Sequence, residues 1–143
     1  ESCASKDRSS MSLYKAFVAY LVSHPEVSGL IGTRLYPRLI PENGQLPAMA
    51  YQLVSLNDPL AHDGAVGVVT RTYQFTCQAV SYNEAQDMAR ALRTALHGFT
   101  GPMGNAENMV QVSMCEYVAH DDGEAIEDAT LTRCDFKFVY MEE

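Results

Sequence analysis

The chain has 143 residues, of which 47% are hydrophobic and 20% are charged. This length suits a single domain with a sizeable core, and the composition is ordinary for a globular protein. No apolar run reaches the roughly 18 residues that a membrane-spanning helix needs. We therefore expect no membrane association through such a helix.

Negative charge is concentrated near the end of the chain. Residues 107–143 contain ten acidic and two basic residues, whereas residues 1–106 contain eight of each. The last quarter therefore carries the whole formal net charge of −8. An acidic surface repels a phosphate backbone, so we expect no nucleic-acid binding.

The first residues look like a lead rather than a part of the domain. The stretch ESCASKDRSS lacks the apolar centre of a signal peptide, and Met11 precedes a helical pattern as a natural start would. We predict a disordered lead or extension at residues 1–11 and a single domain at residues 12–143.

Helices and a short edge strand are predicted next. Ser12 is placed to cap a helix. Its apolar stripe consists of Leu13, Ala16, Phe17, Tyr20 and Leu21. Pro25 ends this helix or opens a short second helical turn. Arg34–Leu39 is short and extended, and Pro37 confines it to a sheet edge.

Two strands joined by a long loop are predicted in the middle of the chain. Met49–Leu56 alternates between apolar and polar residues and should pair with the strand that begins at Arg71. The connection Asn57–Thr70 is long for a hairpin, and loops of that length tend to be functional or mobile. With Asp63-Gly64 at its centre, the hairpin would place Ala50, Gln52 and Val54 opposite Cys77, Phe75 and Tyr73.

The stretch Arg71–Gly101 predicts one strand followed directly by one helix. The apolar face of the strand consists of Tyr73, Phe75, Cys77 and Ala79. Ser81–Glu84 has the S-x-x-E form of a capping box, and Gly98 stands where a left-handed C-terminal cap belongs. Between them, apolar residues recur at helical spacing at Ala85, Met88, Ala89, Leu92, Ala95 and Leu96, with Phe99 beyond.

A loop and a second hairpin are predicted at the end of the chain. Glycine and proline in residues 101–105 indicate the loop. Met109–Val118 and Thr130–Met141 indicate two long strands around an acidic connection, Ala119–Ala129.

The cysteines indicate neither a zinc site nor a disulfide framework. Cys3, Cys77, Cys115 and Cys134 are widely spaced and contain no C-x-x-C pair. A symmetric second hairpin would place Cys115 opposite Cys134. In a reducing compartment such a pair stays as thiols.

Together these elements predict an α+β domain. Its antiparallel sheet would have about four main strands, with two main helices packed on one face. The other face is polar enough to meet water or a wet protein interface. It carries Gln74, Thr76, Gln78, Gln111 and Ser113.

No histidine pattern indicates catalysis. His62-Asp63 and His120-Asp121 could suggest a metal phosphohydrolase or part of a triad. Both pairs lie in predicted loops, however, and no nucleophile elbow accompanies them. His97 falls in the last turn of a helix, where capping is favoured over catalysis. His24 is a further helix-end residue.

The acidic residues do not indicate a metal site either. Asp121, Asp122, Glu124, Glu127 and Asp128 lack the register of a calcium loop. No glycine-rich phosphate-binding motif occurs in the sequence. We therefore expect no enzyme, no cofactor and no bound metal.

Four segments follow one another in a recognisable order. They are Gly32–Pro37 (GTRLYP), Leu46–Gln52 (LPAMAYQ), the strand and helix of Arg71–Gly98, and the closing strand near Arg133–Tyr140. In this order they resemble the tail-completion, or tail-terminator, proteins of long-tailed double-stranded DNA bacteriophages. The resemblance spans Leu13–Met141.

The resemblance implies a structural role in the virion, at the neck of the tail, with assembly in the host cytoplasm. Copies would form a ring, expected to be hexameric, at the head-proximal end of the tail tube. The ring would end polymerisation of the tube protein and dock on the head connector or stopper protein. DNA would pass through only as cargo.

Exposed sheet edges and loops are what such a ring needs, because an unpaired edge can accept a strand from a neighbour. The candidate interface residues are Arg34, Tyr36, Arg38, Asp58, His62, Asp63, Val66 and Arg71. The acidic residues of 121–128 could line a channel in which DNA slides, or could face solvent or a basic partner.

Two other functions stay open. The chain could be another small head–tail connector or a minor tail protein. It could also be a ligand-binding α+β module, because sheets of this kind carry many functions.

Overall fold

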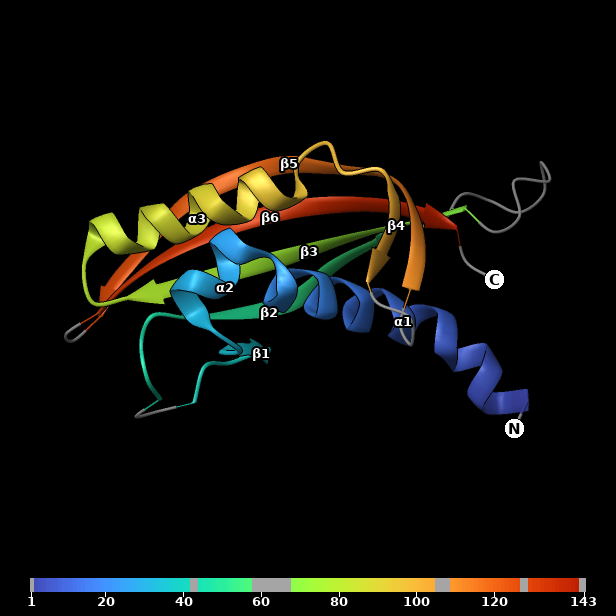
Figure 1. Cartoon of the computed structure of the whole chain (residues 1–143), viewed down its shortest axis with the longest axis horizontal. Helices are drawn as coiled ribbons and strands as arrows, with labels where there is room; N and C mark the ends of the chain where they lie inside the picture. The colour runs from blue at the N-terminus through green and yellow to red at the C-terminus, as the bar shows by residue number, and fades with distance from the viewer. Residues whose placement is uncertain (1, 42–43, 58–67, 105–108, 127–128, 142–143) are drawn as a thin grey trace.

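Three helices and six strands make up the described part of the chain (Figure 1). The computed structural model describes residues 2–41, 44–57, 68–104, 109–126 and 129–141. The elements are α1 (Ser2–Ser23), α2 (Pro25–Ile31), β1 (Leu35–Pro37), β2 (Ala48–Asn57), β3 (Val68–Ala79), α3 (Tyr82–Leu96), β4 (Gly101–Gly104), β5 (Met109–Ile126) and β6 (Ala129–Met141). The α+β class is confirmed. None of the described helices has the length and apolarity to cross a membrane.

The strands form one mixed sheet in the order β1-β2-β3-β6-β5-β4. β1 runs parallel to β2, whereas the other neighbouring strands are antiparallel. The prediction of an antiparallel sheet with four main strands is therefore corrected in two respects. The short edge strand is parallel, and the stretch Gly101–Gly104, predicted as a loop, forms the other edge strand by pairing with Met109–Val112.

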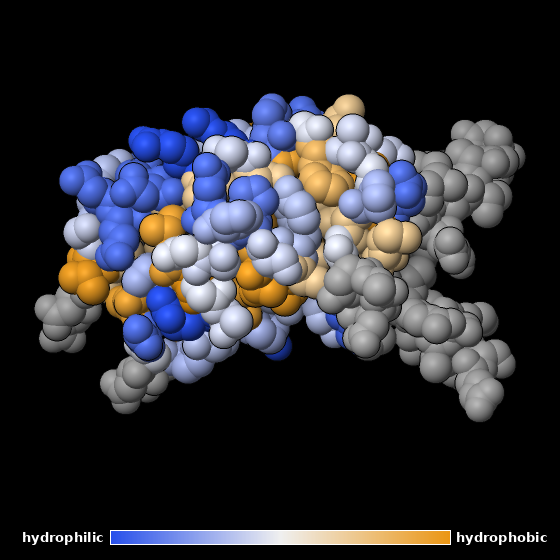
Figure 2. Space-filling model, viewed as in Figure 1, coloured by the Kyte–Doolittle hydropathy of each residue, from blue (hydrophilic) through white to orange (hydrophobic). Residues whose placement is uncertain are grey.

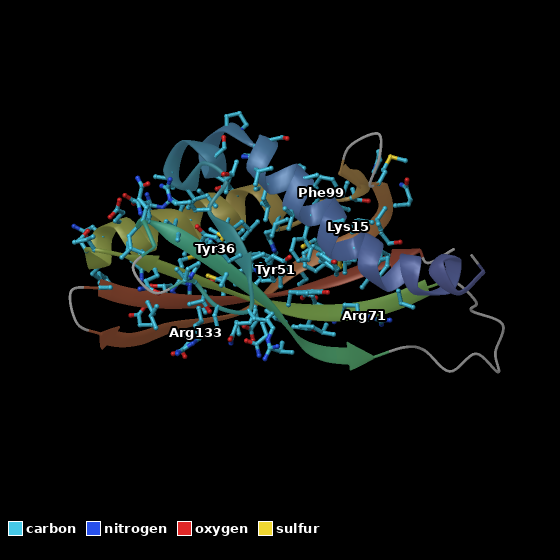
Figure 3. All side chains as sticks on the ribbon, turned by 90° about the horizontal axis from the view of Figure 1, so that it is seen from below. Lys15, Tyr36, Tyr51, Arg71, Phe99 and Arg133 are labelled. Atoms are coloured by element: carbon cyan, nitrogen blue, oxygen red, sulfur yellow. The ribbon has the colours of Figure 1, made fainter. Side chains whose placement is uncertain are left out.

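The helices cover one face of the sheet, and the opposite face stays open (Figure 3). Two main helices on one face were predicted, and α2 adds a third element to this layer. Pro25 occupies the first turn of α2, as its fixed φ angle favours. On the open face Gln74, Thr76 and Gln78 are half-buried, and Arg133 points away from the helices.

Phe17 of α1 is the centre of the core. It is fully buried, and the rings of Tyr51, Tyr73, Phe75 and Phe138 surround it with centroid distances of 4.9–5.4 Å. The contact with Phe138 is stacked and the other three are edge-to-face, and such arrangements add to the hydrophobic gain of burial. The apolar face predicted for the strand after Arg71 is confirmed, because its alternate residues are the buried ones.

The register predicted for β2 and β3 is wrong by one residue. Met49 pairs with Cys77, Tyr51 with Phe75 and Leu53 with Tyr73. A shift by one residue moves every side chain to the other face. The predicted register would have turned Tyr51 to the open face and Gln52 into the core, so burial of the aromatic ring explains the observed pairing.

The capping box at the start of α3 forms in part. The Ser81 hydroxyl oxygen accepts a hydrogen bond from the Glu84 backbone N–H at 3.2 Å, and the helix begins at Tyr82. At the other end, Gly98 has a φ of 80°, in the left-handed region that the sequence indicated.

The second hairpin is longer than predicted. β5 continues to Ile126, so Asp121 and Asp122 lie in a strand rather than in a connection. Cys115 pairs with Phe138, whereas Cys134 pairs with His120. The symmetric register fails because the two strands close at Ile126 and Ala129, rather than around the centre of the predicted connection 119–129. Three irregularities in β5 also change the register along the hairpin.

The first helix begins at Ser2, earlier than the Ser12 cap that we predicted. Side chains of this helix are described from Leu13 onward. The division into a lead at 1–11 and a domain at 12–143 stays a prediction.

Candidate assembly surfaces

The outer edge of β2 is the first candidate surface. β1 pairs only with Met49–Tyr51. Within the described residues, Gln52–Asn57 therefore has no strand partner on its outer side. Unpaired backbone groups at such an edge can accept a strand from another chain.

Arg34, a predicted interface residue, forms hydrogen bonds within its own chain next to this edge. Its Nε donates a hydrogen bond to the carbonyl of Pro47 at 2.8 Å, and its Nη2 donates to the carbonyl of Leu30 at 3.3 Å. The guanidinium thus ties the end of α2 to the start of β2. Tyr36, on β1, is half-buried.

Of the predicted interface residues Arg34, Tyr36 and Arg38, Arg38 is the exposed one. Its backbone N–H donates to the carbonyl of Tyr51 at 2.7 Å, and its φ is 71°. A positive φ is uncommon for a residue other than glycine. The bend at Arg38 ends β1 and is followed by Leu39, which is 79% exposed.

A hollow of about 430 Å³ opens beside the β2 edge, between α1 and the start of the sheet. Its walls are aromatic and aliphatic, with one charged residue. The lining consists of Tyr14, Pro37, Arg38, Tyr51, Gln52, Leu53 and Tyr73. Burial raises the pKa of the Tyr51 and Tyr73 hydroxyls, so both stay neutral at physiological pH.

Arg71, another predicted interface residue, is buried. It is 7% exposed, and its Nη1 donates to the carbonyl of Thr70 at 3.2 Å. Its positive charge lowers the pKa of Tyr73 in part, against the larger effect of burial. The predicted contact residues Asp58, His62, Asp63 and Val66 lie outside the described residues.

The outer edge of β5 is the second candidate surface. β4 pairs with Met109–Val112. The end of α3 then covers the next residues: the Gly98 N–H donates to the Cys115 carbonyl at 2.8 Å, and His97 Nδ1 accepts from the Tyr117 N–H at 3.2 Å. Beyond this point, in the described chain, no strand pairs with the outer side of β5.

Acidic side chains accompany this edge. Asp121 lies 3.6 Å from Arg133 Nη1, in a pair across the hairpin. Asp122 accepts hydrogen bonds from the hydroxyl of Tyr82 at 2.9 Å and from Nε2 of Gln86 at 3.0 Å, so it fastens the hairpin to α3. The side chains of Glu124, Glu127 and Asp128 lie outside the described residues.

His120 belongs to a cluster that sequence reasoning missed. Its Nδ1 is hydrogen-bonded to the hydroxyl of Tyr117 and lies 3.9 Å from Cys134 Sγ, while its Nε2 lies 3.6 Å from Asp122. Tyr117 and Asp122 lie on the same strand as His120, and the pairing of β5 with β6 adds Cys134, whereas the sequence had suggested only the neighbouring Asp121. Knowledge of the hairpin register would have been needed to find them.

The geometry of this cluster does not suit a nucleophile. Cys134 is fully buried, so a substrate has no path to its sulfur. A hydrogen bond with Cys134 and then burial raise the pKa of the neighbouring Cys77 well above its usual range. Among the described residues, no three histidine, cysteine or acidic side chains converge on a metal position.

Apolar residues on the face seen in Figure 1 form small separate patches among hydrophilic ones (Figure 2). That face therefore offers no single broad apolar surface. The two sheet edges and the hollow beside β2 are the better candidates for contacts with other chains.

Comparison with known proteins identifies a shared fold. The chain resembles one from the virion of a native gene transfer agent (GTA) particle, with a TM-score of 0.69 and 16% sequence identity. The match covers 93% of this chain and 97% of the other. No family model matches the sequence, and no curated protein matches it. At this identity the likeness shows that the two chains have the same fold.

Proposed function

We propose that this chain is a structural protein of a phage-like virion. It forms a ring at the head-proximal end of the tail tube, ends polymerisation of the tube protein and joins the tail to the head connector. The observation that carries the proposal is the fold shared almost end to end with a chain of a GTA virion. The order of sequence motifs that resembles tail terminators supports the same role.

The two open sheet edges suit a ring. A subunit with different free surfaces on opposite sides can contact one neighbour with each, and such contacts close into a ring when the rotation allows it. We expect a hexamer, assembled in the host cytoplasm, with the tube protein on one side and the connector or stopper on the other. DNA passes through the ring without being held.

Termination of the tube follows from occupancy of its growing end. A ring that binds the last tube subunits covers the surface on which the next ones would add. Tail length is then set when the terminator binds, and the outer side of the ring presents new contacts to the head.

Deleting the gene from the particle that encodes it tests this role. We expect overlong tails and tails without heads in electron micrographs, and a plasmid copy of the gene should restore normal particles. Normal tails joined to heads in the deletion strain would exclude the proposal.

A connector or minor tail protein is the alternative within virion assembly. Loss of a protein that only joins tail to head should leave free tails of normal length, because tube growth still ends correctly. Tail length therefore separates the two roles.

A ligand-binding module is the alternative outside virion assembly, and the hollow beside β2 is the observation that favours it. An isolated chain that takes up a small apolar ligand there and never joins a tail would support that function.

A further inference from the structure

We infer that the outer edge of β5 in one copy docks on the outer edge of β2 in the next copy, beside the hollow. This inference rests on the proposed ring and names the surfaces that build it. The order of strands places β2 and β5 toward opposite ends of the sheet. A contact between them uses two different surfaces and repeats from copy to copy.

Within the described residues, the short outer strands leave a part of each edge open. β1 covers three residues of β2, and β4 covers four residues of β5. The open stretch of β2 is Gln52–Asn57, and the open stretch of β5 begins after Tyr117, where the hydrogen bonds from α3 end. Each stretch is long enough for several backbone hydrogen bonds with a strand of a neighbour.

Exposed large apolar side chains occur on both open stretches. Among the described residues, eight large apolar side chains are exposed, and three of them lie on these stretches: Leu53, Val54 and Val118. Leu39 follows β1, Met109 and Met114 lie on the part of β5 that β4 and the end of α3 cover, and the other two are Val80 and Tyr82. In a monomer, exposed apolar side chains beside an unpaired edge bring no stability. They also favour aggregation through that edge. A neighbour that covers both edges explains their position.

The charges of the two edges are complementary. Arg38 is the one charged residue that lines the hollow. β5 contains no lysine or arginine. On its open stretch Asp121 and Asp122 keep side-chain exposures of 69% and 52%, and Asp121 also pairs with Arg133 of its own chain at 3.6 Å. Complementary charge favours encounter and fixes the partner surface.

Charge also selects the head-to-tail arrangement over a symmetric one. Two β5 edges brought together would oppose one acidic row to another, and two β2 edges would oppose two copies of Arg38. Like charges that face each other disfavour a contact. The β2 edge of one copy and the β5 edge of the next avoid both conflicts.

Two variants, each blocking one edge, test the contact. Leu53→Lys blocks the β2 edge and Val118→Lys blocks the β5 edge, because a lysine on an edge strand opposes pairing. Both side chains are partly exposed, at 41% and 49%, so the fold should tolerate the changes. Val80→Lys, at 65% exposure, is the matched control outside both edges.

Native mass spectrometry and sedimentation of the full chain give the readout. The wild type and Val80→Lys should form assemblies larger than dimers. Each edge variant alone should be monomeric, with its dissociation constant raised about tenfold or more, as loss of a central contact does. A one-to-one mixture of the two edge variants should form heterodimers and nothing larger, since only one intact β2–β5 contact remains.

Three results would overturn the contact: a wild-type chain that stays monomeric, an edge variant that assembles alone, or a mixture that stays monomeric. The deletion strain distinguishes failure of this contact from failure of the proposed function. Overlong tails in that strain, together with a mixture of edge variants that stays monomeric, would disprove only the β2–β5 contact. Normal tails, together with heterodimers in the mixture, would disprove only the terminator role. Circular dichroism of each variant confirms that it is folded.

Discussion

The hydroxyl of Tyr20 on α1 donates a hydrogen bond to the backbone carbonyl of Ala95 near the end of α3, at 2.7 Å. The two residues are 75 positions apart in the sequence, so the bond fastens the first helix to the third. Burial raises the pKa of the Tyr20 hydroxyl, which therefore stays protonated and able to donate at neutral pH.

Tyr20→Phe should lower the free energy of unfolding by about 1 kcal/mol, because it removes the donor and leaves the carbonyl of Ala95 without it. Urea unfolding at pH 7 measures the loss. Tyr14→Phe is the control, since within the described chain the Tyr14 hydroxyl has no hydrogen bond and its ring only stacks on Tyr51. Equal losses in both variants would contradict a role for the Tyr20 bond.

A series at Ser81 should separate the cap of α3 from simple loss of a side chain. Ser81→Ala should cost about 1 kcal/mol, whereas Ser81→Gly should cost only a few tenths, because glycine suits the capping position without a side chain. Ser81→Asp should keep most of the stability, since its carboxylate can accept the same hydrogen bond from Glu84. Unchanged stability in Ser81→Ala would show that the hydroxyl contributes no cap.

Phe17→Ala should be the most destabilising of these changes, at about 3–5 kcal/mol, because it leaves a cavity among packed aromatic rings. Thermal and urea unfolding both report it. Val18→Ala on the same helix should cost less, since Val18 is only half-buried. A small loss for Phe17→Ala would mean that α1 is not held on the sheet as described.

Local patterns were enough to predict most of the elements. The alternation from Tyr73 to Ala79 and the cap at Ser81 act within a few residues, and the structure contains both. The strand β4 could not be found in this way. Gly101 and Pro102 are typical of a turn, and only pairing with β5 draws them into the sheet.

Pairing between distant residues was the harder part to predict. The direction of β1 depends on its contacts with β2. A strand of three residues has no sequence pattern that distinguishes parallel from antiparallel pairing. The position of Cys134 next to His120 likewise depends on the register of β5 against β6, so spacing along the sequence could not predict that contact. The candidate edges were predictable only in part. Pro37 indicated a sheet edge near β1 and β2, whereas the open edge of β5 depends on how far that strand extends.

The buried thiol of Cys115 should make the fold sensitive to alkaline pH. Burial raises its pKa from 9.0 to about 12. Above pH 9 the unfolded chain loses this proton while the folded chain keeps it, so the unfolded state is favoured. The free energy of unfolding should therefore fall as the pH rises from 9 towards 12, by up to about 1.4 kcal/mol for each pH unit from this one group.

Urea unfolding at pH 8, 9 and 10 measures this slope for the wild type and for Cys115→Ala. The variant should be less stable at pH 8, because a buried side chain is lost, but its stability should fall less steeply above pH 9. Met103→Ala is the control: it also removes a fully buried side chain, but one that does not titrate, so its slope should match that of the wild type. Parallel slopes for all three proteins would mean that the folded chain ionises Cys115 as readily as the unfolded chain does, and that burial does not keep the thiol protonated.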